Sequence, residues 1–292
     1  MSNTILTGEA AADILAAMQK AGLNGWEMFV PEGVEEIAPG AFAGMKNLRR
    51  VQLPKTLRRI GAAAFYGCEN LTQITLPAGL VELGTAAFKN SGLQEVSVPT
   101  RALKLGCEVF ADSALRCAEI KGRQTGESMF RGCCQLAKVQ LSDNIRKIEA
   151  GMFRDCATLK TLRLPEKLEQ IGIEAFAGCG ALERLSIPES VREMGEGAFR
   201  GCAFETVHIP EAVEELHWEM FSECRQLKSV YIPAGVKYIE ADVFYGCDAL
   251  KNVCFGADLA AMQAIRIGEG NETLSKAVLR CGILNKPETG EK

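Results

Sequence analysis

Three side chains that can do chemistry recur at a regular interval in the C-terminal half of the chain. Ser186, His208 and Tyr231 are 22 and 23 residues apart, and each is the middle residue of a short alternating run that ends in proline. If these runs are stacked parallel strands, the three side chains lie next to one another on an outward-facing surface. A serine beside a histidine can act as a nucleophile with its general base, which is the chemistry of a hydrolase.

Catalysis by Ser186 and His208 would also need an orienting acid and an oxyanion hole. The outer surface of an open sheet encloses no site and does not exclude water. We therefore expect no enzyme, and a hydrolase is the least favoured alternative. Tyrosine and arginine are enriched at the strongest contacts of protein interfaces. The sequence predicts a site for a protein partner, formed by Arg163, Arg184, Ser186, Glu205, His208, Lys228 and Tyr231. The competing interpretation is an ordinary solvated surface.

The cysteines are the second group that could do chemistry. Seven of the twelve form one column: Cys68, Cys133, Cys156, Cys179, Cys202, Cys224 and Cys247. The chain has no C-x-x-C pair and only two histidines, so we expect no metal centre and no cofactor. Stacked thiols are not barred from pairing as disulfides. However, a small, weakly polar side chain packed beside a turn explains the column without redox chemistry, and outside the column we expect Cys117 and Cys254 to point outward.

An internal repeat must position all these residues. Ten of the thirteen phenylalanines follow one another at intervals of 20 to 23 residues. These ladder phenylalanines are Phe42, Phe65, Phe88, Phe110, Phe130, Phe153, Phe176, Phe199, Phe221 and Phe244. The column cysteine comes three residues after the ladder phenylalanine, and a leucine usually follows three residues later. Such self-similarity is the signature of a solenoid built from stacked coils.

Each repeat predicts one coil. The alternating L-x-x-V-x-L segment suits a short strand with one buried face. Eight of the ten prolines directly follow this segment, and proline stops a strand because it cannot donate to the ladder. The chain then returns along a second side and closes through an Ala-Phe-x-Gly-Cys turn, which we expect to be 3₁₀. Parallel stacking at about 4.8 Å would join the coils into one continuous core.

The repeat resembles the BspA-type leucine-rich repeats, bacterial 23-residue units of the form L-x-x-I-x-L-P-x-x-L-x-x-I-G-x-x-A-F-x-x-C-x-x-L. The resemblance covers about residues 26–256. It implies an α+β, strand-rich repeat protein, a leucine-rich-repeat solenoid with parallel strands on its concave face. Characterised members are often cell-surface adhesins, so a surface adhesin that contacts host matrix proteins is the main functional alternative to a protein-interaction scaffold.

The ends of the chain are expected to differ from the repeats. We predict a helical cap over residues 1–25, with Thr7 capping a helix over 8–21, a solenoid of about ten repeats over 26–256, a second helical cap over 257–285 and a disordered tail over 286–292. The second cap would hold one helix from Asp258 to Ile267 and another over 272–281. The repeats are irregular around 110–130, where we expect a kink or bulge.

Charge and composition limit the possible partners. The net charge is −4 with 47% hydrophobic residues, which argues against a nucleic-acid surface. The first residues contain Glu9 and Asp13 and lack the basic and apolar segments of a signal peptide, and no apolar stretch is long enough to span a membrane. We expect a cytoplasmic monomer without membrane insertion, or a cell-surface protein if a leader has been removed.

Overall fold

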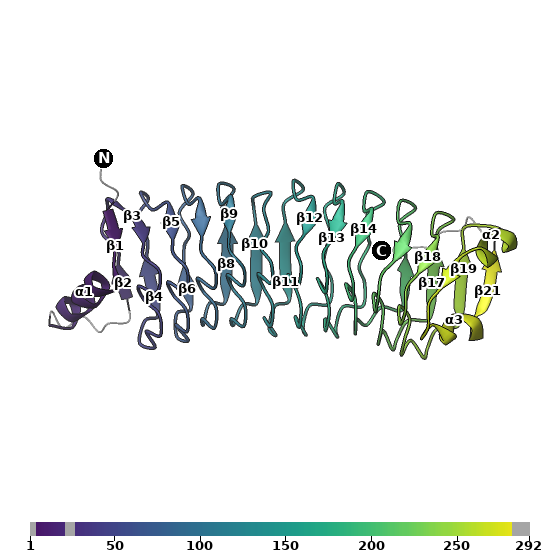
Figure 1. The fold of residues 1–292 in the computed structure, drawn as a ribbon. Helices are drawn as coiled ribbons and strands as arrows, with labels where there is room; N and C mark the ends of the chain where they lie inside the picture. Colours follow the sequence, from purple (N-terminus) through teal and green to yellow (C-terminus); the bar gives the residue numbers. More distant parts are fainter. Residues whose placement is uncertain (1–3, 21–26, 282–292) are drawn as a thin grey trace. The chain divides into compact units, whose positions relative to one another are not determined.

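The chain folds into two strand-rich units made of stacked coils. The computed structural model describes residues 4–20 and 27–281 and divides into the units Met1–Ser142 and Asp143–Lys292. In each unit, successive coils follow one another in chain order and contribute strands to two rows (Figure 1). Every strand pair is parallel, which confirms the predicted β-solenoid architecture.

The first strand row contains the segments that precede the prolines. In the first unit it forms the sheets β2-β4-β6 and β11-β10-β8. Their strands are β2 (Glu27–Phe29), β4 (Arg50–Gln52), β6 (Gln73–Ile74), β8 (Glu95–Val98), β10 (Cys117–Ile120) and β11 (Lys138–Leu141). In the second unit the row begins with a bridge between Thr161 and Arg184. It continues as β15 (Thr206–His208), β17 (Ser229–Ile232), β19 (Asn252–Phe255) and β21 (Val278–Cys281).

The second strand row lies on the return side of the coils. In the first unit it is a five-stranded sheet of β1 (Thr4–Leu6), β3 (Val34–Ile37), β5 (Arg59–Ile60), β7 (Glu82–Leu83) and β9 (Lys104–Leu105). In the second unit it forms two sheets. One contains β12 (Lys147–Ile148), β13 (Gln170–Ile171) and β14 (Glu193–Met194), and the other contains β16 (Glu215–Leu216), β18 (Tyr238–Ile239) and β20 (Arg266–Ile267).

The ladder phenylalanines form the core of each unit. All ten rings are completely buried. Consecutive rings stack nearly parallel, with centroids 4.8 to 5.8 Å apart in the first unit and 5.3 to 5.7 Å apart in the second. The repeat therefore places one aromatic ring per coil in a continuous apolar column, because a single coil cannot bury its hydrophobic side alone.

The turns around each ladder phenylalanine have an unusual backbone. The residues two before and two after it have positive φ in every coil from Phe42 to Phe244. Glycine is common two residues after the ring, as sequence reading suggests, but the position before it is often occupied by larger residues, including Glu108 and Glu174. Overlapping i→i+3 hydrogen bonds close the turns, and the part of the chain that the structure describes contains no 3₁₀ helix.

The N-terminal end contains the expected helix together with a strand. Helix α1 (Gly8–Lys20) begins after Thr7, whose Oγ1 accepts a hydrogen bond of 3.3 Å from the Ala10 amide. Ala11 is fully buried. Strand β1 precedes the helix and pairs with β3, so the second strand row already begins at Thr4. The predicted last residue of the helix, Ala21, lies outside the described residues.

The prediction of two C-terminal helices is wrong over half of their length. Asp258 caps a helix as expected, but α2 (Leu259–Gln263) is short, Leu259 is exposed and β20 follows. Helix α3 (Glu272–Lys276) buries Leu274, after which β21 pairs with β19 in register. An edge strand offers unpaired amides and carbonyls that favour another strand over a helix. The predicted tail, 286–292, lies outside the described residues.

The expected kink around 110–130 is absent from the first strand row. β10 pairs residue for residue with β8 and with β11. The shortening falls on the return side, where the sheet ends at β9, and the described residues between β10 and β11 form no return strand. Deleting the return strand keeps the first row in register, because the hydrogen-bonded strands set the spacing of the coils.

Candidate functional site

His208 and Tyr231 are direct neighbours on the first strand row of the second unit. Their Cα atoms are partners in the ladder between β15 and β17. The two rings stack with centroids 4.5 Å apart and an angle of 8° between their planes. The repeat therefore brings together these two members of the predicted site, because each lies two residues before the proline that follows its strand.

Two glutamates hold the ring pair in place. The Nε2 atom of His208 lies 3.2 Å from Oε1 of Glu189, and the hydroxyl of Tyr231 donates a hydrogen bond of 2.8 Å to Oε1 of Glu211. The backbone amide of Glu211 donates to Glu189 at 3.2 Å, which links the two acids. Each glutamate therefore reaches from one coil to the ring of the next coil, and the four side chains form a connected cluster.

Tyr231 is the buried anchor of this cluster. The residue is 5% exposed. Burial, reinforced by the hydrogen bond and charge of Glu211, raises the pKa of Tyr231 to about 12, because both disfavour the phenolate. Its hydroxyl lies 2.5 Å from the position that a Cβ atom would take on Gly256. The tyrosine therefore fits only because the coil after it has glycine at this position.

Three charged members of the predicted site, Glu205, Lys228 and Arg163, form exposed ion pairs. Lys228 and Glu205 form an ion pair of 2.7 Å with both side chains more than half exposed. Lys228, and more weakly Arg184, lower the pKa of the Glu205 carboxyl. Arg163 is 78% exposed and lies 3.9 Å from Asp143. These ion pairs are solvated and contribute little to the free energy of unfolding. Their side chains are therefore available to a partner.

Ser186 does not join the ring pair. Its side chain is exposed. In the described part of the chain, Nε2 of His208 faces Glu189 and Nδ1 has no hydrogen-bond partner, so neither ring nitrogen bonds the serine. A histidine activates a serine only through a direct hydrogen bond, and this arrangement does not provide one. Glu189 and Glu211 were not among the predicted site residues, although both directly follow the strand-closing prolines, Pro188 and Pro210.

The column cysteines form hydrogen bonds with the backbone carbonyls of the ladder phenylalanines. The thiol of each of six column cysteines donates to the carbonyl of the ladder phenylalanine one coil earlier, at 3.1 to 3.3 Å. Burial raises the pKa of Cys68 and Cys133 to about 11 and of Cys179 and Cys247 to about 12. Such thiols are weak nucleophiles, and their contacts support the structural interpretation.

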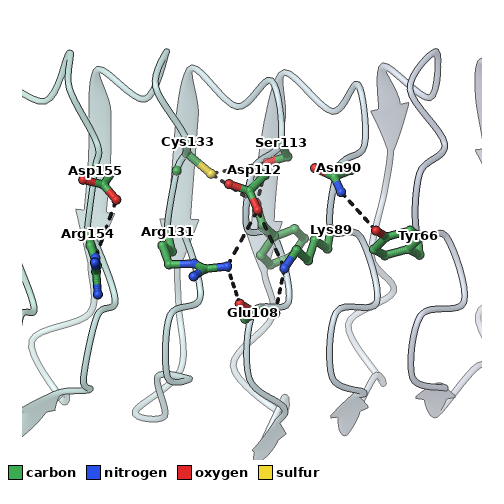
Figure 2. A network of polar contacts seen from close by, with 12 residues as sticks. Tyr66, Lys89, Asn90, Glu108, Asp112, Ser113, Arg131, Cys133, Arg154 and Asp155 are labelled. Atoms are coloured by element: carbon green, nitrogen blue, oxygen red, sulfur yellow. Dashed lines mark hydrogen bonds and ion pairs between the residues drawn. The ribbon is translucent and has the colours of Figure 1, made fainter.

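Ion pairs on the turn side repeat one arrangement in both units. Glu108 contacts Lys89 at 2.9 Å and Arg131 at 2.6 Å, from the coils before and after its own (Figure 2). In the second unit, Glu174 pairs with Arg154 and, at 2.9 Å, with Arg200. Each glutamate has positive φ. Glu108 and Glu174 therefore each bridge three coils.

Neither a metal-binding group nor a membrane-spanning helix is found among the described residues. Over residues 4–20 and 27–281, no three histidine, cysteine, aspartate or glutamate side chains form a group that could hold a metal ion. Within the same ranges, no helix has the length and apolar character needed to cross a bilayer.

The parallel strand rows, the 23-residue period and the buried ring column define both units as leucine-rich-repeat solenoids. The family model of the BspA-type leucine-rich repeat region matches residues 23–125 and 147–265 in six copies. The chain therefore belongs to the BspA-type leucine-rich repeat family, as its repeat suggests.

Solved structures of bacterial leucine-rich repeat proteins are similar to this chain. A leucine-rich repeat protein from Bacteroides ovatus ATCC 8483 is 26% identical with a TM-score of 0.63, and the match covers 87% of this chain and 62% of that one. A leucine-rich repeat protein from Eubacterium ventriosum ATCC 27560 is 18% identical with a TM-score of 0.53, and the match covers 100% and 92%. A comparison with curated proteins finds no match.

Proposed function

We propose that the chain is a non-enzymatic scaffold that binds a protein partner on the first strand row of its second unit. The observation that supports this most is the His208–Tyr231 stack with its two glutamates. Rings held by stacking and by hydrogen bonds lose little conformational entropy when a partner docks. His208 keeps 19% of its side chain exposed, so its edge is the contact that this cluster offers.

The surrounding charges would set the rate and specificity of association. Lys228, Glu205 and Glu189 have exposed side chains, and Arg163 and Arg184 lie in the two preceding coils. Exposed charges at the rim of an interface steer the encounter and make it sensitive to salt, while the buried anchors determine how slowly the complex dissociates. The partner should therefore carry complementary charge around a group that packs against His208.

A charge swap tests the position of the site. The double variant Glu205→Lys/Lys228→Glu keeps an ion pair but reverses its direction, and His208→Ala removes the exposed ring. The matched control is Glu214→Lys/Lys237→Glu, a somewhat more exposed pair of 2.5 Å in the same two coils, next to the second strand row. Tagged protein in lysate of the native host should lose its partner with the first two variants and keep it with the control.

Two outcomes would contradict the proposal. Capture that survives both Glu205→Lys/Lys228→Glu and His208→Ala places the partner elsewhere. Capture that is lost equally in the control swap shows a general effect of charge. Fractionation of the native cells then separates an intracellular scaffold from a surface adhesin, because only the latter leaves the cytoplasm.

A further inference from the structure

The first unit has a notch on its turn side, where two short turns lie between two full-length ones. The coils of Phe88 and Phe110 have one residue fewer after the turn, Ser91-Gly92-Leu93 and Ser113-Ala114-Leu115. The coils on either side keep the full-length segment after the turn. Glu69 in one of them and Gln135 in the other line the two sides of the hollow. A cavity of about 550 Å³ lies between them, and we call it the short-turn notch. Its volume is in the range of small-molecule sites, roughly 300 to 1,000 Å³.

The floor of the notch is fixed by backbone contacts. The Gly92 amide donates to the Cys68 carbonyl at 3.1 Å, and the Ala114 amide donates to the Ser91 carbonyl at 3.1 Å. A Cβ atom on Gly92 would lie 2.1 Å from the Glu69 carbonyl oxygen. The short turns therefore pack down onto the preceding coil, and a full-length turn could not occupy this place. The position of the floor is therefore set by the backbone.

A buried hydroxyl in the floor has no partner. Ser91 is 4% exposed and lines the notch, and its Oγ has no hydrogen bond within the described residues. The equivalent Ser113 donates to the Phe110 carbonyl at 2.7 Å. A buried polar atom without a partner is unfavourable, because it has lost its hydrogen bonds to water. Rotation of Ser91 about χ1 is a small movement between staggered positions, and it would offer the hydroxyl to a ligand.

The rim combines an aromatic ring with amide and carboxylate groups. The ring of Tyr66 is exposed, and its hydroxyl accepts a hydrogen bond of 3.3 Å from the Asn90 amide (Figure 2). Asp112 lies 3.8 Å from Lys89 and 3.9 Å from Arg131. Glu69 pairs with Lys46 at 3.2 Å. Each carboxylate of the notch thus faces a cation already, yet a carboxylate can accept about four hydrogen bonds.

We propose that the short-turn notch binds a neutral saccharide ring. Sugar hydroxyls both donate and accept, which suits carboxylate oxygens, an amide N–H of Asn90 and the Ser91 hydroxyl together. The exposed ring of Tyr66 offers an apolar surface for the C–H face of a sugar. A cationic ligand gains less here, because cations already neutralise Glu69 and Asp112. An anion would face two carboxylates.

Cysteine labelling reads out occupancy with a control in the same molecule. Cys134 is exposed and lines the notch, whereas Cys107 is exposed and lies outside it. We expect methyl glycosides of glucose, galactose, mannose or N-acetylglucosamine to slow iodoacetamide labelling of Cys134 severalfold and to leave Cys107 unchanged. Arginine amide serves as the cationic probe. If none of these sugars protects Cys134, or if arginine amide protects it as well as the best sugar, the proposal is overturned.

Substitutions that other coils already contain avoid misfolding. Asn90 has φ of 57° at a position where Gly44, Gly67 and Gly132 are glycine, so Asn90→Gly removes the amide without new strain. Tyr66→Ala copies Ala43 and Ala111 at the same repeat position. Loss of one hydrogen bond should weaken sugar binding up to about tenfold, and the double variant should abolish protection. The matched control, Glu223→Gly, changes the same repeat position in the second unit (φ of 58°) and should leave protection intact.

The two possible results of the variants are decisive. Equal protection in Asn90→Gly/Tyr66→Ala and in the unaltered chain, with equal thermal stability, would exclude the notch as the sugar site. If that double variant unfolds early, Asp112→Gly provides the second test, because Asp112 also has positive φ (56°) at the glycine position. Partner capture through His208 should not change in any of these variants, so this proposal and the proposed function fail independently.

Discussion

The hydroxyl of Tyr231 lies 2.5 Å from the place of a Cβ atom on Gly256. Side-chain atoms do not approach so closely, so Gly256→Ala must move the tyrosine away from Glu211 and from the His208 ring. We expect a loss of about 1–3 kcal/mol in the free energy of unfolding, the usual cost of overpacking, measured by urea denaturation. Gly180→Ala is the control, since nothing lies within 4 Å of a Cβ atom there. Equal stability of the two variants would show that Tyr231 tolerates displacement.

The raised pKa of Tyr231 links its position to alkaline stability. Its pKa of about 12 exceeds the usual value near 10 because the folded environment disfavours the phenolate. The folded state therefore holds this proton more tightly than the unfolded state. The stabilisation is complete below about pH 10 and is lost as pH rises through 12. Phenolate absorbance of the unaltered chain minus that of Tyr231→Phe should show one group titrating near pH 12.

Glu211→Gln provides the internal check on this assignment. Removing the carboxylate removes the hydrogen-bonded charge that opposes ionisation, so the difference titration should move to lower pH. A difference curve centred near the usual tyrosine value of about 10 in the unaltered chain would contradict the buried, acid-bonded position of Tyr231.

The fold was predictable from sequence wherever burial repeats with the coil. The ladder phenylalanines and column cysteines recur because every coil must fill the same place in the core. The hydrogen-bond partners of His208 and Tyr231 were not predictable in this way. Glu189 and Glu211 lie just after the prolines, at positions that face solvent in other coils, and only three-dimensional stacking shows that they reach the next strand.

The C-terminal end shows where periodicity misleads. Leu274, Ala277 and Val278 have helical spacing, and an isolated segment with this pattern would bury one face. In the structure Val278 begins a strand, since β19 has an unpaired edge that Val278–Cys281 covers. Similarly, the positive φ of Glu108 and Glu174 leaves no trace in the sequence, because these coils adopt a conformation that local propensity disfavours by about 1–2 kcal/mol.

The bridging role of Glu108 predicts an acid-dependent contribution to stability. Hydrogen bonding from Lys89, with the charge of Arg131, lowers the pKa of Glu108. The folded state therefore favours the carboxylate, and the stabilisation is present above the usual glutamate pKa of about 4.3 and lost as pH falls below it. Glu108→Gln should cost roughly 1 kcal/mol or less at neutral pH, and the difference from the unaltered chain should vanish in acid.

A matched exposed pair isolates the effect of bridging. Glu69→Gln removes the acid of a single ion pair whose side chains are 68% and 59% exposed, so its cost should be smaller and more sensitive to salt. Urea titrations of both variants at several pH values provide the comparison. A pH-independent cost for Glu108→Gln would mean that the side chain acts through packing alone.

The thiols predict a sharp division in reactivity. Cys107 and Cys134 are exposed, whereas the column cysteines are buried and have raised pKa values, about 12 for Cys179 and Cys247. Only the thiolate reacts with alkylating reagents, so brief iodoacetamide treatment of the folded chain should modify Cys134 before any column cysteine. Cys107 should react more slowly than its exposure suggests, because burial and the neighbouring Glu127 raise its pKa.

Peptide mass spectrometry gives the rate at each site, and column thiols should become reactive together with loss of structure in urea. Rapid labelling of Cys179 in the native state would mean that its coil opens locally, which a continuous ring column should prevent.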